Sequence, residues 1–226
     1  MKSLTHYIQE KLIIKKSSNY KYFPQTKEEL RNIIEQRIKQ EGNEVNLNDI
    51  DVSNIKDMSH LLEDTNFNGD ISKWNVSNVT NMRDMFYECS NFNQDISQWD
   101  VSNVTDMSFI FSECKLFNQD LSTWNVSNVN DMSGMFWGSK SFNQDISSWD
   151  VSNVEDMSNM FCGCESFNQD ISNWNVSKVT NMRNMFRICK NFNKDISSWN
   201  VSNVKDNNKM FYLCPIEEKY KPKFNI

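Results

Sequence analysis

Apolar and polar positions recur along this chain with a period of 25 residues. Each full copy begins at a tryptophan, and a first copy that begins at Ile50 is one residue shorter. The tryptophans are Trp74, Trp99, Trp124, Trp149, Trp174 and Trp199. Repetition with a period of about 20–50 residues is typical of proteins built from similar, stacked units.

The apolar spacing within one copy predicts a short helix followed by a short strand. In the copy that begins at Trp99, five apolar residues are three, three, one and three residues apart: Val104, Met107, Ile110, Phe111 and Cys114. This spacing places them on one face of a helix, with Asn103 or Ser102 as its N-terminal cap. The stretch from Phe117 into the next copy reads as a short strand and its corner.

Neither element is stable alone, because short helices nucleate poorly and a short strand needs a neighbour. Stacking the copies would bury the apolar side of each coil and pair its strand with the next. The pattern therefore predicts an α/β solenoid of short strand plus short helix coils.

Aligned copies give columns of identical residues, and the apolar columns are interpreted as core. One column holds the tryptophans, and two others hold methionines from Met82 to Met182 and phenylalanines from Phe86 to Phe211. The last copy has Asn207 in the methionine column, which suits a terminal coil that faces water or a cap.

Two polar columns are also unbroken, one of asparagine from Asn68 to Asn193 and one of aspartate from Asp70 to Asp195. We expect the asparagine amides to form a buried ladder that satisfies backbone groups. The stacked aspartates need donors, either turn N–H groups or the serines two residues ahead. A ladder of hard cations is the alternative, because such ions bind carboxylate oxygens.

The chain is predicted to have three parts. Residues 1–49 form an N-terminal cap, with an amphipathic helix at about 26–41 that starts in the capping box Thr26 to Glu29 and ends near Gly42. Residues 50–214 form the coils, which start at residues 50, 74, 99, 124, 149, 174 and 199. Residues 215–226 form a light C-terminal cap. Leu4, Tyr7, Ile8 and Leu12 also lie at helix spacing.

The repeat, quoted as FNQDISSWDVSNVxDMSxMFxxC, resembles the BspA-like leucine-rich repeats, in the tryptophan-containing subtype common in mycoplasma-type and gut-bacterial proteins. The match covers Ile50 to Cys214. The resemblance implies a right-handed, leucine-rich-repeat-like stack and a surface or lipoprotein interaction role. It carries no catalytic residues to transfer.

Composition narrows the classes of function. The 226 residues carry a net charge of −6, which does not favour nucleic acid or an anionic membrane. No apolar run is long enough for a membrane span. The interrupted N-terminal apolar stretch lacks a secretory signal, and with Cys89 as the first cysteine there is no lipoprotein cysteine near the start. We expect a cytoplasmic monomer, with the cell surface as the alternative from the resemblance.

No catalytic or metal site emerges from the sequence. The two histidines, His6 and His60, are too few for a nucleophilic triad or a zinc site with Cys162 and Cys164. Five of the six cysteines share one column, whose remaining copy holds Ser139. We interpret these cysteines as reduced and buried, and the Asn-Val-Ser/Thr triplets as helix caps. The prediction is a non-enzymatic protein with no cofactor and no metal.

The positions that vary between copies are the candidates for binding. The most varied column follows the phenylalanines, and its predicted contact residues are Tyr87, Trp137, Arg187 and Tyr212. Interface hot spots favour these residue types. The alternative is that Trp137 only fills space beside Gly134 and Gly138. A weaker second patch comprises Arg83, Arg183, Asp84 and Lys205.

Three functions are compatible with the sequence. The first is a scaffold that binds an unidentified protein partner. The second is a surface adhesin or lipoprotein of the BspA-like kind. The third is a metal-dependent carbohydrate binder that uses the aspartate and serine columns.

Overall fold

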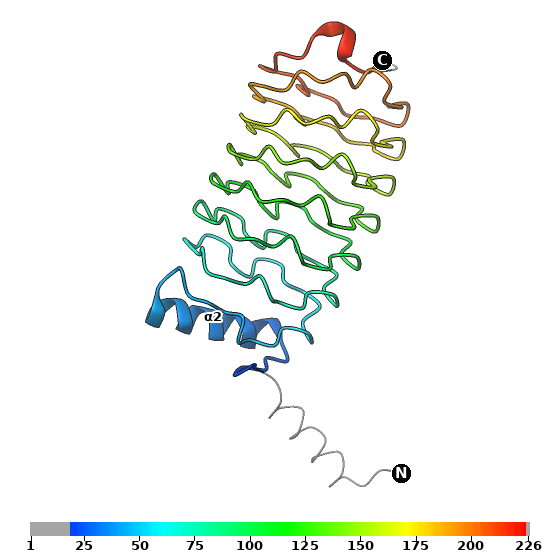
Figure 1. Cartoon of the computed structure of the whole chain (residues 1–226). Helices are drawn as coiled ribbons and strands as arrows, with labels where there is room; N and C mark the ends of the chain where they lie inside the picture. Colours follow the sequence, from blue (N-terminus) through cyan, green and yellow to red (C-terminus); the bar gives the residue numbers. More distant parts are fainter. Residues whose placement is uncertain (1–18, 225–226) are drawn as a thin grey trace, which may run out of the picture.

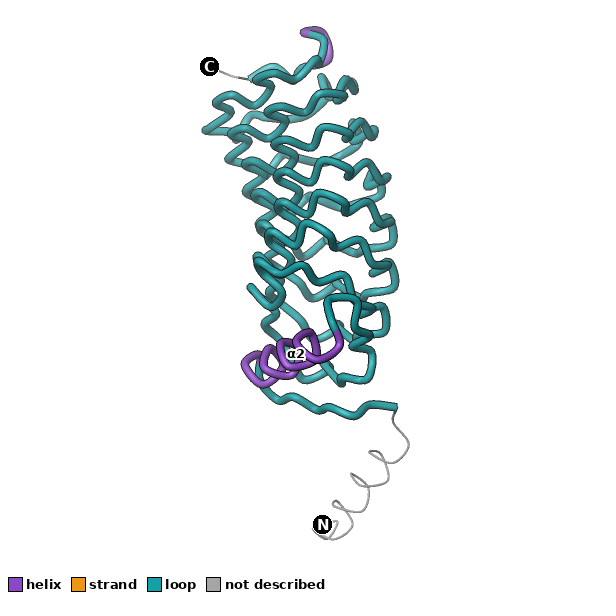
Figure 2. The backbone as a smooth tube through the Cα atoms, turned by 90° about the vertical axis from the view of Figure 1, so that its left-hand side faces the viewer, coloured by secondary structure: helices purple, strands orange, loops and turns teal. Residues whose placement is uncertain are grey.

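The computed structural model describes residues 19–224 and shows coils stacked along one axis (Figure 1). The helices in this part are α2, Lys27–Glu41, and a short 3-10 helix η1, Glu218–Tyr220. The coils themselves are turns and loops (Figure 2). Isolated parallel bridges join one position of each coil to the next: Asp57, Asn81, Asp106, Asp131, Asp156, Asn181 and Asp206. The segment around Leu4 to Leu12, with its predicted helical spacing, lies outside the described residues.

The predicted α/β solenoid, a leucine-rich-repeat-like stack of short strand plus short helix coils, is wrong. Residues 104–114 contain a bridge at Asp106 and linked turns at 108–113 instead of a helix, and no continuous strand occurs within residues 19–224. Coil spacing explains the difference. The rings of Phe86 and Phe111 are 5.6 Å apart, and those of Trp74 and Trp99 are 6.4 Å apart. Adjacent helices need about 8–10 Å, so a helix in every coil does not fit.

The segment predicted as helix is a series of linked turns, called here the turn run, which comprises residues 82–89 and their equivalents in the other coils. Asp84 and Glu88 have φ values of 54° and 58°, in the left-handed region. The Met85 N–H donates to the Met82 carbonyl at 3.2 Å within the coil, whereas the Asp84 N–H donates to the following coil at 3.0 Å. Alternate N–H groups therefore bind within and between coils, which a helix does not allow.

Acidic and amide side chains hold the corners of each coil. Asp95, Asp100 and Asp106 each accept the backbone N–H of the serine two residues ahead, at 2.9, 3.1 and 2.9 Å. These are Asx turns, in which the side chain replaces a backbone acceptor. The prediction that the aspartate column is satisfied by turn N–H groups is confirmed.

The predicted asparagine ladder forms, but the prediction that it is buried is wrong, because it lies at the surface of the stack. The Asn118 N–H donates to Asn93 Oδ1 at 2.9 Å, and the series ends where the Glu217 N–H donates to Asn193 Oδ1 at 2.9 Å. These asparagines are half-buried or exposed. Asn103, predicted as a helix cap, instead donates its amide to a carbonyl of the preceding coil at 2.7 Å. Side chains thus link the coils where the backbone does not.

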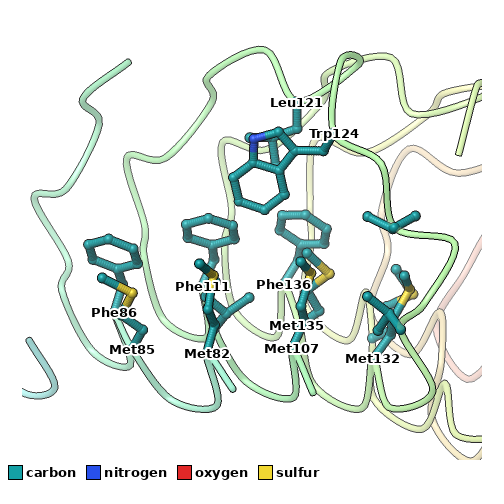
Figure 3. Close-up of a cluster of buried hydrophobic side chains, with 14 of the residues drawn as sticks. Met82, Met85, Phe86, Met107, Phe111, Leu121, Trp124, Met132, Met135 and Phe136 are labelled. Atoms are coloured by element: carbon teal, nitrogen blue, oxygen red, sulfur yellow. The ribbon is translucent and has the colours of Figure 1, made fainter. Parts of the chain in front are cut away.

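The core consists of columns of stacked side chains, as predicted. Phe86, Phe111 and Phe136 follow one another in successive coils, with Trp124 lying across them (Figure 3). All six column tryptophans are at most 5% exposed, and the column methionines from Met82 are fully buried. Each added coil extends this core, which explains how a chain with so little regular secondary structure can form a folded stack.

The two ends of the stack are covered differently (Figure 1). At the first coil lies α2, which buries Leu30 and Ile34. Thr26 Oγ1 caps the helix by accepting the Glu29 N–H at 3.1 Å. At the last coil, the tail that contains η1 packs on one side and buries Ile216. Lys221 of the tail lies over the Phe211 ring, but the tail accepts no backbone N–H of the last turn run within residues 19–224.

Candidate functional site

The four predicted contact residues lie in the turn runs, one residue after the buried phenylalanines. Their carbonyls accept hydrogen bonds from the preceding coil: the Glu113 N–H donates to Trp137 at 2.6 Å, and the Ile188 N–H donates to Tyr212 at 2.9 Å. This pairing fixes their backbones in register, so that the column follows one edge of the stack.

The column is not a continuous exposed stripe. Ser112 is fully buried and Cys162 is 4% exposed. Trp137 and Tyr212 are 41% and 51% exposed, whereas Tyr87 and Arg187 are half-buried. The structure therefore divides the predicted residues into two pairs, separated by the buried Cys162.

Tyr87 and Trp137 line one open groove of about 450 Å³. The other lining residues are polar or charged: Asp64, Asn66, Glu88, Ser90, Glu113 and Lys115. Three carboxylates and one ammonium group make this groove acidic. Lys115 Nζ lies 3.8 Å from Glu113 Oε2, a contact too exposed to hold the groove closed.

The groove wall depends on two glycines. A Cβ at Gly134 would lie 2.2 Å from Phe109 Cε1, and one at Gly138 would lie 2.2 Å from Glu113 Oε1. Phe109 and Glu113 therefore occupy the space beside these glycines. The Trp137 ring leans on Phe109, with centroids 6.3 Å apart and planes at 59°.

Electrostatics in the groove favour a positively charged ligand group. A hydrogen bond to Glu88, together with partial burial and the carboxylate of Glu113, raises the pKa of the Tyr87 phenol. Tyr87 therefore stays protonated at neutral pH and can donate or accept a hydrogen bond. The ring of Trp137 adds a face suited to cation–π contact.

Arg187 and Tyr212 form the second pair, near the C-terminal end. The guanidinium carbon of Arg187 lies 5.8 Å from the centroid of the Tyr212 ring. Arg187 Nε is buried and has no hydrogen-bond partner among residues 19–224. This pair does not line the groove of Tyr87 and Trp137.

The weaker predicted patch is not assembled. Arg83 pairs with the adjacent Asp84 at 3.1 Å. Arg183, which lies several coils further along the stack, is 3.9 Å from Asp206. These contacts belong to separate coils, so Arg83, Arg183 and Lys205 do not form one site.

Sequence reasoning missed the groove residues Asp64, Asn66, Ser90 and Lys115. Asp64 was missed because the variable columns were compared only among the full copies, which begin at Trp74. Asp64 and Glu88 share the left-handed conformation, with φ values of 55° and 58°. Aligning the first copy from its start, with Ile50 opposite Trp74, would have shown a column of three acidic residues, Asp64, Glu88 and Glu113.

The aspartate and cysteine columns serve the stack. The Ser122 N–H holds the pKa of Asp120 below its ordinary value. The N–H groups of the equivalent serines lower the pKa of Asp145 and Asp170 in the same way. No three His, Cys, Asp or Glu side chains within residues 19–224 are grouped to hold a metal ion. The thiol of Cys164 donates to the Phe136 carbonyl of the preceding coil at 2.8 Å.

Comparison with known proteins places the repeat in a family. The family model described as "Mycoplasma protein of unknown function, DUF285" matches residues 29–138 and again residues 116–221. The chain belongs to the DUF285 family. The first DUF285 match begins inside α2, whereas the second covers coils and the start of the C-terminal tail. A search of curated proteins found no match. In the described part, no helix has the length and apolar character to cross a bilayer.

Proposed function

We propose that this chain is a non-enzymatic scaffold that binds another protein in the groove of Tyr87 and Trp137. The observation that carries the proposal is the exposed indole of Trp137, held against Phe109 at the edge of an acidic groove. A rigidly supported aromatic ring loses little entropy on binding, and such residues dominate interfaces. The carboxylates of Glu88 and Glu113 favour a partner segment with lysine or arginine.

The proposal is tested by affinity capture from lysate of the source cell. The groove variant combines Tyr87→Ala with Trp137→Ala, and the matched control is Tyr212→Ala, an exposed aromatic of the same column outside the groove. A protein enriched by the wild type and the control, but lost with the groove variant, would support the proposal. Its affinity should fall as salt rises.

A partner lost with Tyr212→Ala and retained by the groove variant would contradict this placement of the site. Capture of no partner at all would argue against a scaffold role. Both variants need melting temperatures close to that of the wild type, so that loss of binding is separated from loss of folding.

A second candidate function is a cell-surface adhesin or lipoprotein role of the BspA-like kind, which the repeat sequence resembles. The DUF285 matches, which together cover residues 29–221, support a relation at the level of the repeat. Protease treatment of intact, unpermeabilised cells is the test. Digestion of the protein would favour this role, and full protection until lysis would contradict it.

A further inference from the structure

The backbone hydrogen bonds between turn runs all point in one direction along the stack. At each of the six interfaces between successive coils, four N–H groups donate toward the C-terminal end. In one interface the donors are Met82, Asp84, Phe86 and Glu88, and the acceptors are the carbonyls of Asp106, Ser108, Ile110 and Ser112. Aligned peptide dipoles add up, so the C-terminal end of this side carries positive partial charge.

The last coil leaves this row of donors open. The equivalent N–H groups belong to Asn207, Lys209, Phe211 and Leu213, and none of the four has an acceptor among residues 19–224. The tail does not cover them, because it pairs elsewhere: the Ile196 N–H donates to the Tyr220 carbonyl at 3.0 Å. Leu213 is 65% exposed beside this edge. An uncovered row of donors is a template for a further segment of chain.

A groove of about 670 Å³ runs between this edge and the tail. Phe211 lies in its wall together with four lysines: Lys209, Lys219, Lys221 and Lys223. Lys219 and Lys221 are paired with glutamates, whereas Lys209 and Lys223 have no ion pair within the described residues. In a chain of net charge −6, this concentration of positive charge distinguishes the groove from the surface as a whole.

The direction of the bonds argues against a second copy of the chain as the occupant. Head-to-tail stacking would need the carbonyl edge of the first coil, where α2 already lies (Figure 1). Lys27 donates to Asp57 at 2.7 Å there, and Arg31 donates to the His60 carbonyl at 2.5 Å. Two-fold pairing of the last coils would set donors against donors, which leaves them unsatisfied.

We propose that the C-terminal edge binds an acidic peptide segment of another protein. The edge offers only donors, because the carbonyls of Asn207 and Lys209 are used within the coil by Met210 and Tyr212. An extended strand would bring N–H groups of its own against this edge, whereas a segment in the turn-run conformation offers its carbonyls, as residues 106–112 do inside the stack. Ionised Asp and Glu side chains add groups that are acceptors only. Carboxylates would meet both the N–H row and the lysines, and apolar side chains would cover Phe211 and Leu213.

The probe is a capped synthetic peptide of residues 106–113, which carries Asp106 and Glu113. Inside the stack, the carbonyls of this segment accept the equivalent N–H row of the coil before it. The experiment is a titration of the full chain followed by amide NMR. The expected result is shifts at the N–H groups of Asn207, Lys209, Phe211 and Leu213. The matched control peptide replaces Asp106 by Asn and Glu113 by Gln, and it should bind at least about tenfold more weakly.

A variant with Lys209→Glu and Lys223→Glu should weaken binding of the acidic peptide by about tenfold, because two exposed ionic contacts are reversed. A variant with Lys56→Glu, an exposed lysine of the first coil, and Lys178→Glu makes the same charge change away from this edge and should leave binding unchanged. Trp137→Ala should also leave it unchanged, so failure here and failure of the proposed scaffold function are separable.

Several results would overturn the proposal. These are absence of shifts at the four amides, equal binding of the neutral peptide, or equal loss with both lysine variants. Concentration-dependent dimerisation through the same amides would show that a second copy is the occupant. Binding of anionic vesicles in place of the peptide would point to a membrane.

Discussion

The indole Nε1 of Trp149 donates a hydrogen bond of 2.9 Å to the carbonyl of Leu121, the residue three before Trp124, which starts the preceding coil. Trp99 and Trp174 repeat this contact with Ile71 and Ile146, each at 3.2 Å. The tryptophan column therefore fills the core and also satisfies a buried carbonyl in each coil.

Trp149→Ala should destabilise the fold by about 3–5 kcal/mol, because it leaves a large cavity. Trp149→Phe should cost about 0.5–1.5 kcal/mol for the lost hydrogen bond, because the Leu121 carbonyl keeps its second donor, the Trp124 N–H. Trp137→Ala, at the surface, should cost less than about 1 kcal/mol. Urea unfolding of the three variants measures these free energies. Equal losses for Trp137→Ala and Trp149→Ala would contradict the division between core and groove.

The cysteine column should require a small hydrogen-bond donor, since Ser139 replaces the thiol and donates to the Phe111 carbonyl. Ser139→Cys should therefore change the free energy of unfolding less than Ser139→Ala. The alanine variant should lose about 1 kcal/mol, the typical net value of one hydrogen bond. The same ranking is expected for Cys164→Ser against Cys164→Ala. Greater stability of the alanine variants in urea would show that only size matters at this column.

Alkaline pH should destabilise the fold through the buried thiols. Burial raises the pKa of the Cys89 thiol from 9.0 to about 11. A thiol whose pKa is higher in the folded chain contributes stability that is present below about pH 9 and is lost as the pH rises toward 11. Urea midpoints at pH 8 and pH 11 should differ less for Cys89→Ser than for the wild type. If the urea midpoint changed by the same amount between pH 8 and pH 11 in both proteins, the result would contradict a role for this thiol.

Gly138→Ala should destabilise the fold and displace the Glu113 side chain. The backbone there has a φ of 71°, and the added Cβ would meet Glu113 Oε1. Gly163→Ala is the control, because Gly163 has a similar φ of 74° and a Cβ added there would lie 3.6 Å from the nearest heavy atom. The control should cost about 1–2 kcal/mol for its left-handed backbone alone. Thermal unfolding should show a larger loss for Gly138→Ala, and equal losses would mean that Glu113 moves freely.

Calcium should not raise the melting temperature. The Oδ1 atoms of Asp120, Asp145 and Asp170 already accept the N–H groups of their serines. A ligand that binds only the folded state raises its stability, so an unchanged melting temperature in millimolar calcium is the expected result. A rise that disappears with chelator would revive the cation ladder and the carbohydrate-binding function.

The sequence by itself determined the repeat, the core columns and the side-chain ladders. Trp99, Phe111 and Asn118 recur at a fixed period, so each must meet its own equivalent in the next coil. That inference needs no knowledge of the backbone between them. The sequence also indicated part of the groove, because Tyr87 and Trp137 occupy a column whose residue differs from copy to copy.

Only the tertiary structure decided the conformation of each coil. The apolar spacing from Val104 to Cys114 suits a helix and equally suits linked turns, because both return a side chain to the same face after three residues. A helix uses its N–H groups internally, whereas the turn run gives every second N–H to the next coil. At a ring spacing of 5.6 Å between Phe86 and Phe111, only the turns fit. The same choice aligned the bonds in one direction and left the donors of the last coil open.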